Sequence, residues 1–166
     1  RGRRREGAGR TEADHAGERL RVVGSLQGFL VAPQNPTALL EAMCQPSVKI
    51  ISLTVTEKGY CHDPATGELT EGHPDIQHDI MNPSTPRSAP GYIARAIKLR
   101  QDNGLPPFTV LCCDNLPANG HTVRNVVSRL GALQDLELGH YINDTIAFPS
   151  TMVDRIVPAT TEDDRS

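Results

Sequence analysis

The chain lacks tryptophan, and aromatic residues make up only 4% of its 166 residues. It also lacks any apolar run of about 18 residues, the least that a transmembrane helix needs, so we expect no membrane span. The formal net charge of −3 gives no general electrostatic reason to bind nucleic acid or an anionic membrane. The basic start, Arg-Gly-Arg-Arg-Arg-Glu, has no apolar stretch behind it, which excludes a secretory or twin-arginine signal there.

Cysteines are few and lack the spacing of a metal or redox site. No C-x-x-C pair occurs among Cys44, Cys61, Cys112 and Cys113. We therefore expect unpaired, buried thiols, as suits a reducing cytoplasm. The histidines of the H-P-D-I-Q-H stretch, residues 73–78, have no cysteine at zinc spacing, so no metal site is predicted.

A glycine-rich phosphate loop is also missing. A dinucleotide-binding fold normally places G-x-G-x-x-G directly after its first strand. The candidate near the start, Gly7-Ala8-Gly9, has no strand before it, and position 12 is Glu. The sequence therefore predicts no phosphate loop of its own.

The composition divides the chain into three parts. Residues 1–20 are polar with little to bury, so we expect them to be disordered, and we expect a loose polar tail at 159–166. Residues 21–158 are the expected folded domain. The chain does not begin with Met, which suggests a processed, trimmed or partial polypeptide.

The alternation of segments within 21–158 predicts an α/β protein. Apolar runs rich in β-branched residues at 48–55 and 108–113 are typical of buried strands in a parallel sheet, and residues 21–26 resemble a short strand. Helical spacing of apolar residues predicts helices at about 36–44, 77–82, 88–102, 119–130 and 135–145, with an extended segment at 146–157. Strands that alternate with helices favour parallel βαβ units in a three-layer α/β sheet.

Polar residues follow both predicted central strands. Thr54, Thr56 and Glu57 end the first, and Asp114 and Asn115 end the second. In open α/β sheets, ligands bind beyond the carboxyl ends of the strands, so these two clusters could share a crevice. The alternative is that the Asp-Asn pair only forms a turn and caps the next helix.

A charged pair, Asp154 and Arg155, interrupts the apolar segment FPSTMVDRIVP at 148–158. Burying charge is costly unless it is paired. The pair is therefore either a structural ion pair or part of a functional site, and the residues alone leave both open.

Three motifs together resemble the polyol-specific long-chain dehydrogenases, the mannitol dehydrogenase family. They are SLTVTEKGY at 52–60, CDNLPANG at 113–120 and IAFPSTMVDRIVP at 146–158, and the resemblance covers about residues 20–160. It implies an N-terminal Rossmann-type domain and a mostly helical C-terminal domain. It also implies hydride transfer between NAD or NADP and a sugar carbon, without a metal.

The resemblance further implies roles for individual residues. Asn115 looks like one of two amides that hold the substrate oxygen, which suits a neutral N–H donor that stabilises developing negative charge. Asp154 is similar to a residue that shapes the substrate and nicotinamide site, and Glu57 resembles one linked to proton movement. The expected cofactor-binding residues are Thr54, Thr56 and Asp114.

Two parts of the family pattern are not in this sequence: the glycine-rich loop, and the catalytic Lys with its following Asn and His in the helical domain. The expected fold is thus a Rossmann-like parallel sheet flanked by helices, incomplete relative to the family. The expected function is that of an NAD(P)-dependent mannitol 2-dehydrogenase acting on a polyol or ketose, in a chain that is inactive without the helical domain. The alternatives are a fructuronate reductase (mannonate oxidoreductase) and a non-catalytic remnant of such an enzyme.

Overall fold

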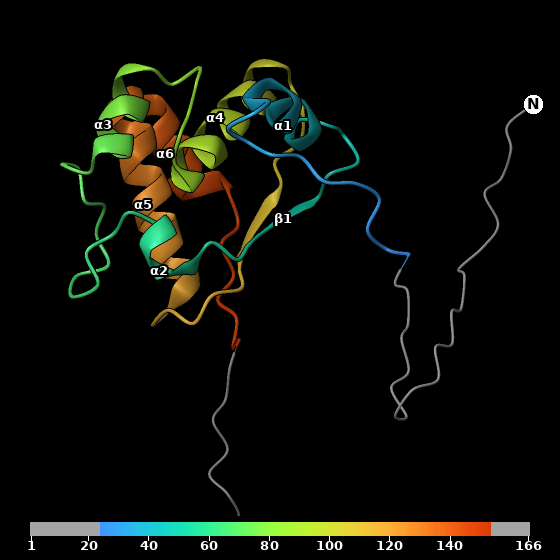
Figure 1. Ribbon diagram of the computed structural model, residues 1–166. Coiled ribbons are helices and arrows are strands. Elements are labelled where there is room, and N and C mark those ends of the chain that lie inside the picture. Colours follow the sequence, from blue (N-terminus) through green and yellow to red (C-terminus); the bar gives the residue numbers. More distant parts are fainter. Residues whose placement is uncertain (1–23, 154–166) are drawn as a thin grey trace, which may run out of the picture.

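The computed structural model describes residues 24–153, which form helices around a parallel pair of strands (Figure 1). The predicted segment 1–20, the tail 159–166 and the pair Asp154-Arg155 lie outside the described residues. The elements are, in chain order, α1 (Pro36–Met43), β1 (Ile50–Leu53), α2 (Thr56–Gly59), α3 (Pro74–Met81), α4 (Ala89–Asp102), β2 (Thr109–Cys112), α5 (Asn119–Gln134) and α6 (Leu136–Thr145).

The two strands run parallel, with Ile50 opposite Thr109 and Leu53 opposite Cys112. The connection between them contains α2, α3 and α4, so the β1-to-β2 segment is the predicted βαβ unit. On the other side of β2, the Val110 amide donates a hydrogen bond to the Ala147 carbonyl, at 3.0 Å between nitrogen and oxygen. The segment after α6 therefore runs beside β2, which confirms an extended chain as far as it is described.

Helices α1 and α4 begin at residues whose side chains cap them. Asn35 caps α1 by accepting the Ala38 amide hydrogen, with Pro36 in the first helical position. Ser88 caps α4 in the same way through the Gly91 amide. These short polar residues satisfy amides that have no partner inside the helix.

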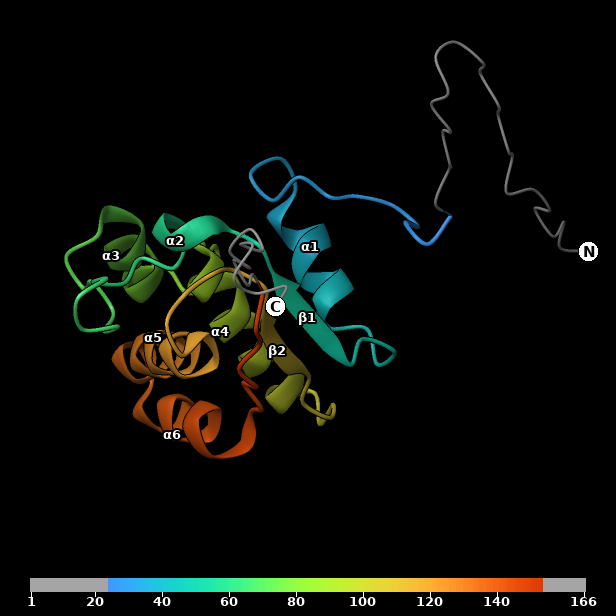
Figure 2. The same ribbon diagram turned by 90° about the horizontal axis from the view of Figure 1, so that it is seen from below.

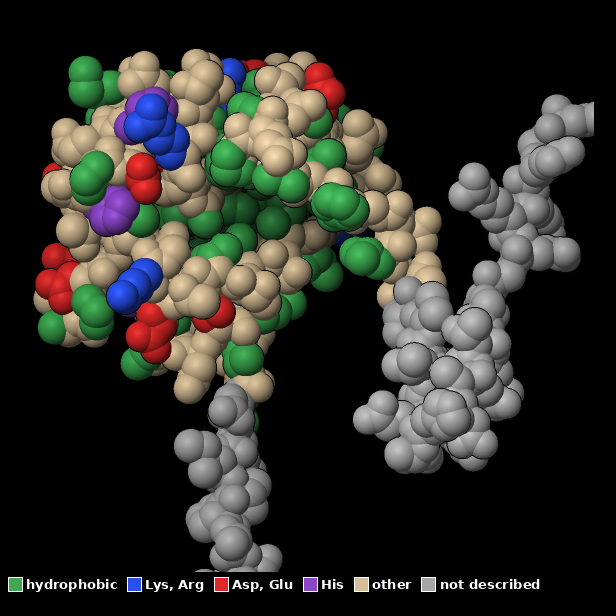
Figure 3. Space-filling view, viewed as in Figure 1, with side chains coloured by type: hydrophobic (Ala, Val, Ile, Leu, Met, Phe, Trp, Pro, Cys, Tyr) green, Lys and Arg blue, Asp and Glu red, His purple; other side chains and the backbone are tan. Residues whose placement is uncertain are grey.

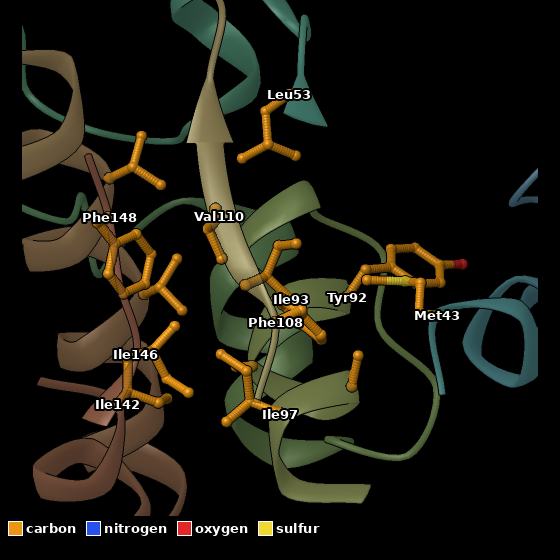
Figure 4. Close-up of a cluster of buried hydrophobic side chains, with 14 of the residues drawn as sticks. Met43, Leu53, Tyr92, Ile93, Ile97, Phe108, Val110, Ile142, Ile146 and Phe148 are labelled. Carbon is orange, nitrogen blue, oxygen red and sulfur yellow. The ribbon is translucent and has the colours of Figure 1, made fainter. Parts of the chain in front are cut away.

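Helix α4 lies between α1 and α5, as seen from the side and from below (Figures 1 and 2). Its apolar face and the strand β2 form the centre of the core, which α6 and the segment after it close from the other side (Figure 4). The apolar residues that recur at helical spacing in α4 and α5 face the core, since the following residues are all at most 9% exposed: Tyr92, Ile93, Ala96 and Ile97 in α4, and Val123, Val126, Val127 and Leu130 in α5.

Several details differ from the sequence prediction, among them the short helix α2, which the sequence analysis did not predict. Residues 24 and 25 form a turn and residue 26 is irregular, so this described part of the predicted strand 21–26 is not a strand. The strand predicted at 48–55 is shorter and less buried: β1 covers Ile50–Leu53, and Ile50 is 59% exposed because no strand described in 24–153 pairs with its outer edge. Helix α3 begins at Pro74 rather than near residue 77, because proline is well suited to a first helical turn.

Candidate functional site

The carboxyl ends of β1 and β2 meet at one edge of the sheet. The strands are parallel and in register, and the Cys113 amide continues the ladder by donating to the Leu53 carbonyl at 2.8 Å. Helix α2 follows β1, and residues 113–118 follow β2; both lie at the lower end of the molecule in Figure 1, where the described chain also ends. Glu57 and Asn115 are therefore at the same strand-end edge, as predicted, and both are exposed.

Asp114 joins these two strand ends. Its carboxylate accepts hydrogen bonds from the Val55 amide at 2.8 Å, the Thr56 amide at 3.3 Å and the Tyr60 hydroxyl at 2.7 Å. All three donors belong to the β1 side, whereas Asp114 belongs to the β2 side. The carboxylate thus satisfies amides at the start of α2, and not at the start of α5 as the turn-and-cap interpretation expected.

Tyr60 is fully buried beneath this junction. Its hydroxyl lies 2.7 Å from Asp114 Oδ2 and 3.1 Å from Cys112 Sγ. Burial, and then the hydrogen bonds with Asp114 and Cys112, raise the pKa of the Tyr60 phenol above its ordinary value. The phenol therefore stays protonated and remains a hydrogen-bond donor to the carboxylate.

Strained backbone marks both strand exits. Thr56 has φ of 63° and Ala118 has φ of 44°. This left-handed region favours glycine, and other residues in it are held there by their surroundings. The start of α2 and the start of α5 are thus fixed in conformations that isolated chain segments would avoid.

A second junction depends on Asn119, whose role the sequence analysis missed. This residue is 2% exposed, and its Nδ2 donates to the carbonyls of Asp114 and Thr151 and to Thr151 Oγ1, at 3.2, 3.1 and 2.9 Å. Its Oδ1 accepts the Thr151 amide at 2.9 Å, and Thr151 Oγ1 donates to the Cys112 carbonyl at 2.6 Å. Asn119 thereby fixes the segment three residues before Asp154 against the end of β2. The sequence analysis placed it only at the start of a predicted helix.

Five of the six predicted site residues gather at this edge. Thr54, Thr56, Glu57 and Asn115 are exposed, and Asp114 is half-buried. The sixth, Asp154, lies outside the described residues. Two open clefts lined by described residues lie elsewhere, one beside α5 and α6 and one where the segment leading into α1 faces residues 85–87 and the start of α4, and none of these site residues lines them.

The four cysteines are unpaired, as predicted. Cys61 and Cys112 are buried, whereas Cys44 and Cys113 are only half-buried. Among the helices within residues 24–153, none combines the length and apolar character that a membrane span requires.

A parallel sheet flanked by helices, with its polar strand ends gathered at one edge, defines a Rossmann-like domain of the nucleotide-binding class. The family model described as the mannitol dehydrogenase Rossmann domain matches residues 8–165. The chain belongs to the mannitol dehydrogenase family.

Individual relatives agree with this assignment. The chain is 50% identical over 149 residues to mannitol 2-dehydrogenase from Cereibacter sphaeroides, covering 90% of this chain and 31% of the relative. It is 46% identical over 143 residues to D-mannonate oxidoreductase from Escherichia coli K12, covering 86% of this chain and 29% of the relative.

A solved structure agrees as well. The Pseudomonas fluorescens mannitol 2-dehydrogenase, in a ternary complex with NAD and D-mannitol, matches with a TM-score of 0.78 and 41% identity. The match covers 92% of this chain and 31% of that structure. The chain thus spans about 30% of the length of the relatives it matches.

The described edge fits one end of a nicotinamide cofactor better than the other. The exposed hydroxyls of Thr54 and Thr56 can donate to and accept from a ribose or a carboxamide. A pyrophosphate normally binds glycine-turn amides at a helix N-terminus. Here the glycine at the start of α5 is not open: a Cβ added to Gly120 would lie 2.5 Å from the Phe148 carbonyl oxygen. The edge thus offers hydroxyl groups that a ribose or carboxamide could use, and the described residues at the start of α5 offer no open glycine turn for a pyrophosphate.

Proposed function

We propose that this chain forms the nicotinamide-facing part of the Rossmann-type domain of an NAD(P)-dependent oxidoreductase of the mannitol 2-dehydrogenase type. The reaction is hydride transfer between a nicotinamide cofactor and a polyol or ketose. The observation that carries the proposal is that Glu57 and Asn115, from two motifs far apart in the sequence, are exposed together at the carboxyl edge of the parallel sheet.

Asn115 is proposed to hold the substrate oxygen. Hydride loss or gain at a carbon places negative charge on its oxygen, and a fixed amide N–H stabilises that charge. Asn115 is exposed, and within residues 24–153 its side chain makes no hydrogen bond that would compete. The amide is neutral and cannot act as a base, so proton transfer falls to other groups.

Glu57 is proposed to help move the proton, and Asp154 to shape the site for the substrate and the nicotinamide. Thr54 and Thr56 are the proposed cofactor-binding residues, whereas the carboxylate of Asp114, which was predicted with them, already accepts hydrogen bonds from Val55, Thr56 and Tyr60. The cofactor supplies the hydride chemistry, and the chain's own residues orient and polarise the reactants. We further propose that a helical domain supplies the catalytic Lys and the remaining wall of the substrate pocket.

A sugar-acid substrate is the second candidate. It is favoured by the 46% identity to D-mannonate oxidoreductase, close to the 50% identity to mannitol 2-dehydrogenase. The residues that separate a polyol from a sugar acid are proposed to lie in the helical domain, so this segment could serve either reaction. A cytoplasmic location is proposed on the free thiols.

The test is to build two chimeras. In each, the aligned stretch of this chain replaces the matching stretch of a relative, either the Cereibacter mannitol 2-dehydrogenase or the Escherichia coli D-mannonate oxidoreductase. NADH formation or consumption is followed with mannitol and fructose for the first, and with mannonate and fructuronate for the second. We expect turnover by each chimera on its host's substrates.

Circular dichroism and a cooperative melt would first establish that both chimeras fold. Two folded chimeras without turnover would contradict the proposal and support the interpretation of the chain as a non-catalytic remnant. Turnover in only one of them would assign the segment to that substrate.

A further inference from the structure

We propose that Asp114 is a positioning residue, whose carboxylate fixes the backbone that carries Glu57 relative to the backbone that carries Asn115. Asp114 directly precedes Asn115, and Thr56, which donates to its carboxylate, directly precedes Glu57. The inference rests on the proposed function, because it assigns Glu57 and Asn115 a joint task at one reacting centre.

The geometry separates this role from that of an ordinary turn residue. Three donors reach one carboxylate: two consecutive amides, of Val55 and Thr56, and the hydroxyl of Tyr60 at the other end of α2. The carboxylate thus holds α2 at both ends. Carboxylate hydrogen bonds are roughly twice as strong as neutral ones, so this single group has the strength to fix the short helix.

The backbone of Thr56 has a disfavoured conformation that contacts from the surrounding structure must stabilise. Its φ of 63° is disfavoured for a β-branched residue, and its amide hydrogen is bound by Asp114 Oδ1. Tyr60 is buried and remains a donor, because burial raises its pKa, so it anchors the other Asp114 oxygen. Without the carboxylate, α2 would lose both constraints and Glu57 would move with it.

The first arm of the test uses the full 166-residue chain and amide hydrogen exchange measured by NMR. Asp114→Asn replaces one acceptor oxygen with an amino group. We expect the protection of the Val55 and Thr56 amides to fall about tenfold or more, while the α5 amides keep their protection. The matched control is Asp63→Asn, because the carboxylate of Asp63 accepts one backbone amide, that of Ala65 at 2.8 Å, in an exposed turn.

The second arm uses the mannitol 2-dehydrogenase chimera. With Asp114→Asn we expect kcat to fall about 10²-fold, the loss expected when a catalytic group is misplaced by about 1 Å, while the KM for NAD changes little. Tyr60→Phe should lower kcat in the same direction but less, and combining the two changes should cost less than the product of the single losses. Asp63→Asn should leave kcat and KM unchanged.

Each outcome decides the matter. If Asp114 has only a structural role, Asp114→Asn should lower the melting temperature but leave kcat per folded molecule unchanged. That result would overturn the inference. A tenfold or larger rise in the dissociation constant for NADH, with kcat unchanged at saturation, would assign Asp114 to cofactor binding and also overturn it. A folded but inactive unsubstituted chimera would overturn the proposed function itself, whereas an active chimera unaffected by Asp114→Asn would overturn the positioning role alone.

Discussion

Single residues at the strand ends divide into exposed groups and groups that hold them. Glu57 and Asn115 are exposed at the edge, and Asp114, Tyr60 and Asn119 form the hydrogen-bonded layer behind them. Changes in the exposed layer should affect turnover, and changes in the layer behind should also affect stability, because buried polar groups are costly when they lose their partners.

Asn115→Ala should lower turnover about 10²- to 10³-fold in the catalytically competent chimera, since one donor to a developing oxyanion contributes that much. The affinity for the cofactor should change little. Steady-state kinetics and NADH titration by fluorescence measure the two quantities. Asn125→Ala, at an exposed position on α5, is the control and should leave both unchanged. Unchanged turnover in a folded Asn115→Ala variant would return Asn115 to a simple turn role.

Tyr60 should make the fold sensitive to alkali. Its pKa is raised in the folded state, mainly by burial, so above pH of about 10 only the unfolded chain loses the phenolic proton. The stabilisation is therefore complete below pH of about 10 and is lost as the pH rises further, by about 1.4 kcal/mol per pH unit. Urea unfolding at a series of pH values from about 8 to about 11.5 measures how the free energy of unfolding falls with pH. Tyr60→Phe should make this dependence on pH weaker.

The contribution of Cys61 begins to be lost at a lower pH than that of Tyr60 and overlaps it above pH of about 10. Burial, and then the charges of Asp75 and Asp79, raise its thiol pKa from 9.0 to about 11. The stability it contributes is thus present below pH 9.0 and is lost as the pH rises toward about 11. Cys61→Ala should remove this part of the slope and leave the Tyr60 part. An identical slope in all three chains would contradict both assignments.

At the scale of elements, the decisive contact is between the start of α5 and the extended segment after α6. Asn119 binds Thr151, and Gly120 lies directly against the backbone of residues 148–150. This contact brings the segment that leads to Asp154 to the carboxyl end of β2. The end of β2, the start of α5 and the segment after α6 are thus held together by side-chain hydrogen bonds and close backbone packing.

Gly120→Ala should break this contact. The added Cβ would lie 2.5 Å from the Phe148 carbonyl oxygen and 2.7 Å from the Ser150 nitrogen, and these backbone atoms cannot move aside as a side chain would. We expect a loss of about 1–3 kcal/mol in the free energy of unfolding, typical of overpacking. Gly72→Ala is the control, because nothing lies within 4 Å of its added Cβ. Equal urea midpoints for the two variants would contradict the close packing.

On the scale of the whole molecule, residues 24–153 expose several large apolar side chains. Leu26, Phe29 and Ile50 are 77%, 85% and 59% exposed, and hydrophobic side chains gather where the segment before α1 runs (Figure 3). Exposed apolar patches mark surfaces that pack against further protein. This agrees with a chain that spans about 30% of the length of its relatives.

The 166-residue chain alone should therefore show no useful turnover. General acid–base help contributes roughly 10²- to 10⁴-fold, and the sequence has no counterpart of the helical-domain Lys that would supply it. A weak pyrophosphate site and an open substrate side should lower the rate further. The assay follows NADH or NADPH absorbance with fructose and fructuronate, and a separate fluorescence titration measures NADH binding.

We expect weak NADH binding without turnover. Turnover near that of an ordinary dehydrogenase would show that this chain builds its site in another way. No NADH binding at all, in a chain that melts cooperatively, would contradict the assignment of Thr54 and Thr56 to the cofactor.

The sequence by itself determined the two central strands, most of the helices around them, the inward faces of α4 and α5, and the edge at which Glu57 and Asn115 lie. The elements and their faces follow from local periodicity, which chain neighbours set, and the shared edge follows because a strand–helix–strand connection makes the two strands parallel. The family resemblance was also readable from the sequence, because each of its three motifs is a contiguous stretch of the chain. The roles of Glu57, Asn115 and Asp154 stay predictions.

Only the tertiary structure decided what Asp114 and Asn119 bind. Their partners Val55, Tyr60 and Thr151 are 32 to 59 residues away in the sequence, and the packing of distant segments selects such partners. The exposure of Ile50 was also decided there, because burial of a strand depends on neighbours that its own residues do not specify. Local pattern thus fixed which residues lie at the edge, and long-range packing fixed which of them are held and which are exposed.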